Sequence, residues 1–329
     1  MNLKEFLTAK HWSGLDCGES DRNFYCFHPI RTRSCRLIFN EADAVRRDWC
    51  EYWTVEKFLK ERIPFDNALS ICCGFGEIER SLARLNVAKR ITGIDIAPGA
   101  VEQATKRAEN ENIINLEYKV ANINTEELVD GNYDLIWANG ALHHVEDLEK
   151  VVLKLYRGLK PGGYLVANEY VGPRYQQIGT RQQEIINAVK HLLPAEFRND
   201  ATVNGSDSLK RRMIRFLNKL WTRGLCVPSG YGRLWRPFPV WYHLLRDPSE
   251  CVHSDRIIPT LQKVFDDVNI RYFAGSILFY ALDENFYRNF DATNAVHQRL
   301  LVLLFDIEDA LIEAGQLKPD HAHIICRRT

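Results

Sequence analysis

The stretch Leu69–Arg80, LSICCGFGEIER, decides the fold prediction, because a short apolar run ends in a glycine turn and a helix-like segment follows. Gly74 and Gly76 form a Gly-x-Gly pair, but the third glycine of a dinucleotide-binding fingerprint is missing. Glu77 and Glu79 fall in the first turn of the expected helix, where they complement its positive end and repel a pyrophosphate. The turn therefore favours a ligand that has no phosphate and carries positive charge.

Strand-like and helix-like segments alternate on both sides of this turn. The expected strands span residues 68–74, 90–96, 115–123, 133–140, 164–170, 268–273 and 321–328. Helical spacing of apolar residues follows the first, second and fourth of these strands, and amphipathic helices are expected at 275–290 and 294–313. This alternation predicts a doubly wound, mostly parallel seven-stranded α/β sheet with its ligand at the carboxyl ends of the strands. The last two strands are expected to be an antiparallel pair in the same sheet.

The character of the chain changes on either side of this core. We expect an N-terminal helical cap at 1–65, a cofactor-binding core at 66–170, a helical acceptor-binding insert at 171–265, and the last strand pair with intervening helices at 266–329. The insert is dense in Gly, Pro, Arg and aromatic residues near its end, which favours a lid or an acceptor-binding wall.

Composition narrows the class of protein. The 329 residues include 43 Lys+Arg and 43 Asp+Glu, so there is no basic excess of the kind that nucleic-acid binders show. The nine cysteines are odd in number, two are adjacent, and none forms a Cys-x-x-Cys pair, so we predict no disulfide framework and no metal. No secretion signal and no apolar run of about 20 residues is present, which predicts a cytoplasmic protein without a membrane partner. A homodimer is left open.

S-adenosylmethionine is the ligand that fits the acidic turn, because it carries a sulfonium, an ammonium and an adenosine. Asp95 ends the second strand, 19 residues after Gly76, where its carboxylate would accept hydrogen bonds from a ribose diol. The alternative role of Asp95 is to cap the following helix. Asn122 would face the adenine edge, or else form a turn. The predicted cofactor contacts are Cys72, Gly74, Gly76, Glu77, Asp95, Ile96, Asn122, Ile123 and Asn139.

Residues 68–170 resemble the class I S-adenosylmethionine-dependent methyltransferases in the glycine turn, in Asp95 and Asn122, and in the stretches YDLIWANGALHHV and GLKPGGYLVANEY. The resemblance implies the Rossmann-like methyltransferase fold, with S-adenosylhomocysteine as the product. Two positions depart from the family pattern: Ser70 replaces the usual acidic residue of the first strand, and Cys72 replaces the first glycine of the turn. The contact with the methionine ammonium is then expected to move elsewhere, with Glu77 as one candidate.

The flanking segments resemble, more faintly, a bacterial subgroup associated with glycan or natural-product assembly. The stretches that carry this resemblance are FHPIRTRSCRLIFN (27–40), EYVGPRYQQIG (169–179) and RDPSECVHSDRIIPTLQKVF (246–265). It implies a small-molecule acceptor.

Methyl transfer to a hydroxyl or an ammonium requires removal of a proton near the sulfonium. His143 and His144 follow the fourth strand, and Glu169 ends the fifth, so all three are candidate catalytic residues. We expect His144 to lie at a helix start, to be neutral near pH 7 and to act as the base, with His143 pointing in a different direction. Packing at the helix start is the alternative for the histidines, and a structural salt bridge is the alternative for Glu169.

Aromatic and arginine side chains are the candidates for acceptor binding, because rings stack on rings or sugars and guanidinium groups bind phosphate. The predicted contacts are Tyr170, Tyr231, Arg236, Trp241 and His253. The alternative is that these aromatics form the core of a helical lid.

These features predict a methyltransferase that acts on a hydroxyl or amine of a small molecule, with a sugar-containing or natural-product acceptor. Two alternatives are a nicotinamide-dependent oxidoreductase, disfavoured by the missing glycine and the paired glutamates, and a non-catalytic S-adenosylmethionine-binding protein, for which Ser70 and Cys72 would be the warning.

Overall fold

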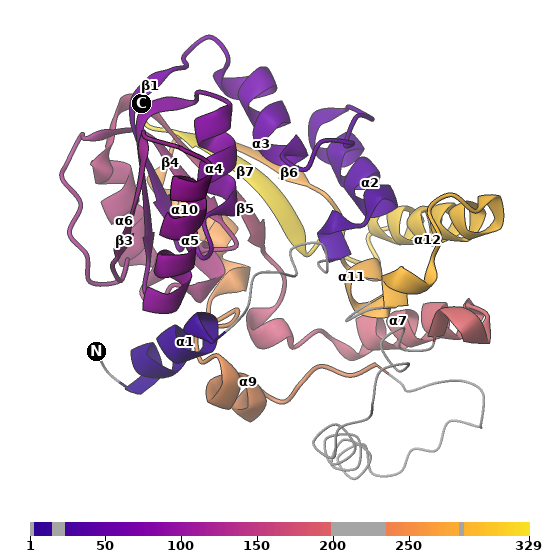
Figure 1. Cartoon of the computed structure of the whole chain (residues 1–329). Coiled ribbons are helices and arrows are strands. Elements are labelled where there is room, and N and C mark those ends of the chain that lie inside the picture. Colours follow the sequence, from indigo (N-terminus) through magenta and orange to yellow (C-terminus); the bar gives the residue numbers. More distant parts are fainter. Residues whose placement is uncertain (1–2, 15–23, 199–234, 283–285) are drawn as a thin grey trace.

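A seven-stranded sheet is the centre of the computed structural model, which describes residues 3–14, 24–198, 235–282 and 286–329 (Figure 1). The strands are β1 (Phe65–Ile71), β2 (Ala88–Asp95), β3 (Leu116–Val120), β4 (Tyr133–Asn139), β5 (Leu159–Tyr170), β6 (Asp267–Tyr272) and β7 (His321–Arg327). Their order is β3-β2-β1-β4-β5-β7-β6. The first five strands are parallel, and β7 runs antiparallel between β5 and β6. The predicted doubly wound sheet with a final antiparallel pair is confirmed.

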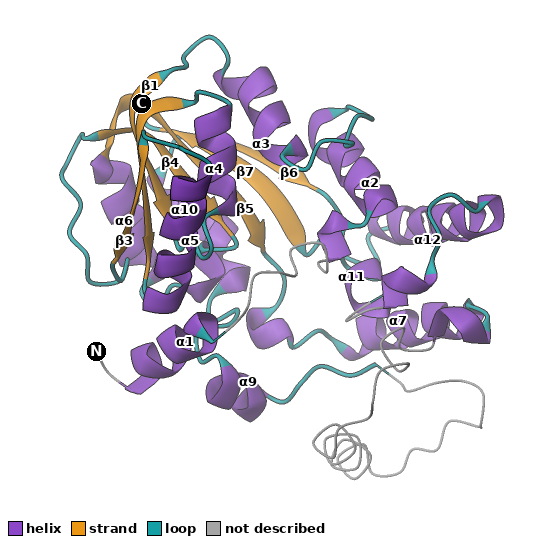
Figure 2. Cartoon of the chain, in the orientation of Figure 1, coloured by secondary structure: helices purple, strands orange, loops and turns teal. Residues whose placement is uncertain are grey.

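Helices cover both faces of the sheet (Figure 2). The α-helices are α1 (Leu3–Ser13), α2 (His28–Phe39), α3 (Trp49–Thr54), α4 (Glu77–Arg84), α5 (Pro98–Asn110), α6 (Leu148–Gly158), α7 (Thr180–Leu192), α9 (Val240–Arg246), α10 (Ile257–Val264), α11 (Leu278–Ala281) and α12 (Ala295–Glu313). A π-helical turn spans Val55–Leu59, and short 3-10 turns span Phe24–Cys26, Leu142–His144, Arg174–Gln176, Ala195–Arg198, Ser254–Arg256 and Phe286–Asn289. Among the helices of these ranges, none has the length and apolar character that a bilayer crossing requires.

The apolar run of β4 shows why the strands are so hydrophobic. Leu135 and Trp137 pack on the face covered by α4 and the π-helical turn, whereas Ile136 and Ala138 pack on the face covered by α6 and α10. Successive side chains of a strand point to opposite faces, so a strand buried on both faces needs an uninterrupted apolar run. The run LIWA is therefore the sequence signature of a central parallel strand.

A second core lies beyond the carboxyl end of β5. It is formed by α7, α11 and α12, and it includes Tyr170 at the end of β5. Residues from the expected insert and from the expected last part share this core, so the four-part division of the chain stays a prediction. Helices α2 and α3 pack with Phe273, which follows β6, whereas α1 lies apart from them, at the carboxyl ends of the strands (Figure 1).

One helix prediction was wrong. In place of the single helix expected at 275–290, the described residues form two short elements, α11 and the 3-10 turn Phe286–Asn289. The buried Glu308 of α12 accepts hydrogen bonds from the backbone N–H groups of Ile277 and Leu278 and so fixes where α11 begins. Residues 277–278 and 280–282 are all buried, so this stretch is not the amphipathic helix that its spacing suggested.

Candidate active site

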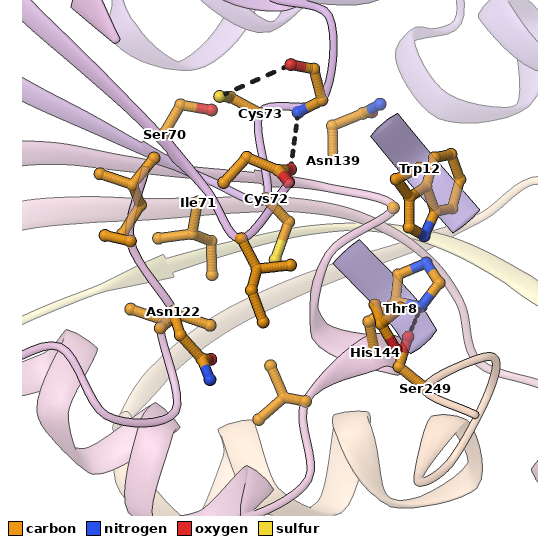
Figure 3. Close-up of a pocket in the computed structure, with 18 of the residues that line it drawn as sticks. Thr8, Trp12, Ser70, Ile71, Cys72, Cys73, Asn122, Asn139, His144 and Ser249 are labelled. Carbon is orange, nitrogen blue, oxygen red and sulfur yellow. Dashed lines mark hydrogen bonds between the residues drawn. The ribbon is translucent and has the colours of Figure 1, made fainter. Parts of the chain in front are cut away.

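A cavity of about 380 Å³ opens at the carboxyl ends of β1, β2 and β4 (Figure 3). This is the position predicted from the strand–helix alternation. Eight of the nine predicted cofactor contacts line it, namely Cys72, Gly74, Glu77, Asp95, Ile96, Asn122, Ile123 and Asn139. The fold therefore gathers residues from four separate chain segments around one volume of the size typical of a small-molecule site.

Gly76, the ninth predicted contact, has a different place. It does not belong to the cavity lining, and its φ of 75° is a left-handed conformation. A Cβ atom on Gly76 would stand 2.2 Å from the hydroxyl oxygen of Tyr118, which donates a hydrogen bond to the Gly76 carbonyl. The glycine is needed for close packing of the turn on β3. Cys72, by contrast, takes a φ of 50° although it carries a side chain.

Asp95 ties the glycine turn to the second strand. Its Oδ2 accepts a hydrogen bond of 2.9 Å from the backbone N–H of Gly74, and its Oδ1 accepts one of 2.8 Å from the N–H of Ala97. Only 8% of the residue is exposed, and burial raises the pKa of its carboxyl. Asp95 is not the cap of α5, because the N-cap position is Ala97 and it has no side-chain cap hydrogen bond, so the alternative role was wrong. Through Ala97 the carboxylate supports the chain that leads into α5, and it also lines the cavity. Each oxygen keeps a lone pair for a ligand.

Asn122 forms the turn that was its alternative role. Its Oδ1 accepts a hydrogen bond from the N–H of Asn124, and its Nδ2 donates one of 3.0 Å to Oε1 of Glu5. The amide still lines the cavity, but its donor is directed to the N-terminal helix α1. Contact with an adenine edge therefore stays a prediction.

The acidic group that the first strand lacks is supplied by Glu79 of α4. The Ser70 hydroxyl donates a short hydrogen bond to Oε1 of Glu79, and both residues line the cavity. Glu79 is only 1% exposed, and its Oε2 has no hydrogen-bond partner among the residues that the structure describes. Burial raises the pKa of this carboxyl to about 7. Sequence reasoning named Glu77, which is exposed at the rim, whereas the serine at position 70 was the signal for an acid reaching in from the helix.

Helix α1 covers the cavity, and sequence reasoning did not place it there. Lys4, Glu5, Thr8 and Trp12 belong to the lining. Its contacts reach three parts of the chain: Lys4 Nζ is 2.5 Å from Glu146 Oε1, Glu5 accepts from Asn122, and Trp12 Nε1 donates to Asp247 Oδ2 at 3.0 Å. Figure 3 shows the Trp12 ring beside that of His144.

His143 and His144 lie in the 3-10 turn after β4, not at a helix start as predicted, because α6 begins only at Leu148. His144 lines the cavity, and its Nδ1 is 3.0 Å from Oγ of Ser249 (Figure 3). Burial, together with the neighbouring His143, lowers the pKa of His144. The expected neutral ring is therefore favoured, although burial rather than a helix terminus is the cause.

The two rings do not point in different directions, as had been expected. Their centroids are 4.2 Å apart. Burial alone would lower the pKa of His143, but its hydrogen bond of 2.7 Å to Oε2 of Glu169 and the charge of that group outweigh burial, so the pKa is raised.

One ring nitrogen of each histidine and a carboxylate oxygen of Glu250 lie within 4.8 Å of one another. We call His143, His144 and Glu250 the histidine–glutamate cluster.

Glu169 is not placed to touch an acceptor. It is 1% exposed, and its Oε1 accepts hydrogen bonds of 2.8 Å from the backbone N–H groups of Ala141 and Leu142. With its bond to His143, the carboxylate holds the whole 3-10 turn against β5. Glu169 is therefore a positioning residue for His143, which corrects its predicted direct role.

The predicted acceptor residues lie away from the cavity wherever the structure describes them. Tyr231 falls outside the described residues. The hydroxyl of Tyr170 contacts that of Tyr280 at 3.0 Å inside the second core. Arg236 and Trp241 are exposed, and His253 is half-buried, but none of the three lines the cavity. Aromatic density in the insert was thus a poor guide, whereas Ser249, three residues after the end of α9, does reach the cavity.

Comparison with known proteins agrees with this geometry. The family described as methyltransferase domain matches residues 69–167. A 2-phytyl-1,4-naphtoquinone methyltransferase of a Nostoc species is 27% identical over 128 residues, which are 38% of this chain and 56% of that protein. The 27-O-demethylrifamycin SV methyltransferase of Amycolatopsis mediterranei is 32% identical over 107 residues, 32% of this chain and 39% of that protein. The chain thus spans about half or less of the length of these relatives.

Among solved structures, the [4+2]-cyclase SpnF covers 92% of each chain at 14% identity, with a TM-score of 0.46. The match to the family falls on β1 to β5, which carry the glycine turn and Asp95. Residues 69–167 are a methyltransferase domain of the class I, S-adenosylmethionine-dependent type. S-adenosylmethionine is the cofactor of that class.

Proposed function

We propose that the chain transfers the methyl group of S-adenosylmethionine to a hydroxyl or amine of a small molecule. The observation that carries this proposal is the buried Oε2 of Glu79 at the cavity, which has no hydrogen-bond partner in the part of the chain that the structure describes. Asp95 and Glu77 add two further acids to the same lining. A buried carboxylate is costly unless a cation pairs with it, and the ammonium and sulfonium of the cofactor would supply the missing positive charge.

The cofactor would lie with its ribose on Asp95 and its methionine ammonium on Glu79, so that the sulfonium faces the end of β4. His144 and Ser249 line the cavity near that end. In the transfer, the acceptor atom loses its proton and attacks the methyl carbon, the C–S electron pair goes to sulfur, and neutral S-adenosylhomocysteine remains. The protein contributes mainly alignment and a place for the proton, because the sulfonium already activates the methyl group.

The proposal also includes the chemical class of the acceptor. The two relatives described above are named for a naphthoquinone and a rifamycin. Those names support a ring-bearing acceptor of the natural-product type, and the faint resemblance of the flanking segments supports the same class. The Trp12 ring, which lies at the cavity, would stack on such an acceptor.

Calorimetry with S-adenosylhomocysteine and with NAD tests the cofactor assignment. We expect micromolar binding of S-adenosylhomocysteine and binding of NAD at least about 100-fold weaker, since the acids repel a pyrophosphate. Turnover against a panel of quinones, phenols, sugars and amines then tests catalysis. Preferred binding of NAD would contradict the proposal, and tight cofactor binding without turnover on any acceptor would favour a non-catalytic role.

Glu79→Gln should weaken cofactor binding by about tenfold at pH 8, because the ionised carboxylate pairs with the ammonium. Burial raises the pKa of Glu79 to about 7. Affinity for S-adenosylmethionine in the wild type should therefore fall by up to about tenfold per pH unit below pH 7, since binding must first expel the Glu79 proton. The variant should lose this dependence. Titrations between pH 6 and pH 8 measure both effects.

S-adenosylhomocysteine is the matched ligand for this experiment, because it keeps the ammonium and lacks the sulfonium. An equal pH dependence for both ligands places the ammonium on Glu79. A melting experiment is the control that shows whether the variant is folded. Because folding raises the pKa of Glu79, the wild type loses unfolding free energy as the pH rises toward and through about 7. Glu79→Gln should therefore melt no lower than the wild type at pH 8. A pH profile that the substitution leaves unaltered would rule out this role.

Trp12→Ala should weaken cofactor affinity and kcat/KM by about three- to tenfold, because α1 loses both its bond to Asp247 and its edge contact with His144. Ring centroids of Trp12 and His144 are 5.7 Å apart at an interplanar angle of 87°. The matched control is Trp241→Ala, which removes a half-exposed tryptophan outside the cavity lining. Equal effects of the two substitutions would show that α1 does not close the site.

A further inference from the structure

The histidine–glutamate cluster brings three lone-pair groups together beside the cavity. One ligand atom from each of His143, His144 and Glu250 lies within 4.8 Å of the other two. The side chains are exposed by 12%, 14% and 27% respectively, so the cluster is mostly but not fully buried. The question is which cation, a proton or a metal ion, occupies the centre of these groups.

The protonation state of His143 follows from its partner. Its Nδ1 is 2.7 Å from Oε2 of Glu169, whose other oxygen already accepts two backbone hydrogen bonds. Glu169 is therefore an acceptor, and Nδ1 of His143 carries the donated proton. In the neutral ring this leaves Nε2 with its lone pair.

His144 is held by a chain of two hydrogen bonds. The Ser249 hydroxyl donates to Oδ1 of Asp247 at 2.6 Å, so it can accept from Nδ1 of His144 at 3.0 Å. Nε2 of His144 is then the lone-pair atom, and it lies 3.9 Å from Oε2 of Glu250. Both rings thus have Nδ1 fixed by an oxygen partner.

Glu250 is held through Oε1, the carboxylate oxygen that does not face His144. Its Oε1 accepts hydrogen bonds from Sγ of Cys251 at 3.0 Å and from Nε2 of Gln176 at 3.4 Å. The oxygen nearer to His144 is Oε2. Two Nε2 atoms and one carboxylate oxygen, each oriented by an outer hydrogen bond, are the arrangement in which metal-binding histidines are found.

We propose that His143, His144 and Glu250 bind one divalent transition-metal ion. Two imidazoles and one carboxylate suit ions of the zinc, cobalt, iron and manganese class, and they leave coordination positions free. Ligand atoms about 2.0 Å from an ion stand roughly 3.3 Å apart in a tetrahedral site, so small side-chain shifts would close the observed spacing. This proposal replaces the prediction, drawn from the absence of Cys-x-x-Cys pairs, that the chain holds no metal.

The role of the ion rests on the proposed function. Of the three residues only His144 lines the cavity, so the ion would meet an acceptor at a free coordination position on the His144 side of the cluster. An acceptor hydroxyl on that position loses its proton to water more readily, and its oxygen then attacks the methyl carbon while the C–S electron pair passes to sulfur. The sheltered place of the cluster favours acceptors with an oxygen that can reach the ion, such as phenols and hydroquinones.

Ion binding by the full chain, after treatment with a chelator, tests the site. We expect Co²⁺ and Zn²⁺ to bind one per chain with a dissociation constant below about 100 µM. Co²⁺ should develop the visible absorption of nitrogen and oxygen ligands, which separates this site from the nine cysteines of the chain. Glu250→Gln and His144→Gln should each weaken binding by at least about tenfold.

Glu149→Gln is the matched control, because Glu149 is an exposed glutamate of α6 that pairs with Arg256. It should leave ion binding unchanged. Dissociation constants above about 100 µM for both ions, or binding that Glu250→Gln and His144→Gln leave unaltered, would overturn the proposal and assign a shared proton to the cluster. Melting curves show that each variant is folded.

S-adenosylhomocysteine titrated into the same samples separates this proposal from the proposed function. Cofactor binding without ion binding overturns the metal site and leaves methyl transfer standing. Ion binding without cofactor binding supports the metal site and contradicts the proposed function.

Discussion

His144→Gln lowers kcat by about 10²–10⁴ and leaves the affinity for S-adenosylhomocysteine within about twofold of the wild type, if His144 prepares the acceptor for attack. The ring lines the cavity, and Ser249 and the Trp12 ring hold it in place. Glutamine is close in length, so the cavity keeps its shape while the lone pair of the imidazole is lost. Initial rates on the best acceptor of the panel, with cofactor affinity from calorimetry, measure the effect.

The control for this substitution is His253→Gln. His253 is half-buried and lies outside the cavity lining, and burial lowers its pKa just as burial lowers that of His144. It should keep the wild-type kcat. His143 is not suitable as a control, because the rings of His143 and His144 are neighbours in one cluster. A wild-type rate in His144→Gln would leave alignment alone to account for catalysis.

Chelator treatment separates two ways in which His144 could act. If the ring itself takes the acceptor's proton, wild-type protein stripped of divalent ions keeps its rate. If the ring is a ligand, the stripped protein loses about as much activity as the variant does, and Co²⁺ or Zn²⁺ restores the wild type but not the variant. The comparison needs one acceptor and one assay, so it can be run as soon as an acceptor is found.

The sheet and the position of the cavity could be predicted from the sequence because their signals are local. β4 is buried on both faces, and its run LIWA reports this directly. Glycine turns and acids at strand ends mark one edge of a parallel sheet, so residues such as Gly74 and Asp95 could be brought together without a structure. At these positions the order of residues along the chain is enough to predict their place at the edge of the sheet.

The rest of the site depends on contacts between distant segments, which no local pattern specifies. Trp12 reaches Asp247 across 235 residues, and Ser249 reaches His144 across 105. The direction of the two histidines was missed because they lie in a single 3-10 turn held by Glu169, whose burial the sequence does not reveal. Aromatic density in the insert suggested an acceptor wall, but density alone does not distinguish a wall from a core.

Asp95→Ala should weaken S-adenosylmethionine binding by about 1.5–3 kcal/mol, or roughly 10- to 150-fold, since hydrogen bonds to a charged group are lost. The structure indicates that the substitution should also lower the stability of the protein. Without the carboxylate, the N–H groups of Gly74 and Ala97 lose their partners, so the glycine turn and the entry to α5 are no longer tied to β2. We therefore expect the unfolding free energy to fall by about 1–3 kcal/mol, while the sheet survives.

Asp95→Asn separates the loss of cofactor affinity from the loss of stability. Its single amide oxygen can still accept a hydrogen bond from Gly74 or Ala97, while the charge is gone. It should recover part of the lost stability and little of the lost affinity, if the ribose diol needs the carboxylate. The measurements are denaturant unfolding without ligand and calorimetric titration with S-adenosylmethionine. Full cofactor affinity in either folded variant would remove Asp95 from the ribose site and leave it the purely structural role of joining the turn to the helix.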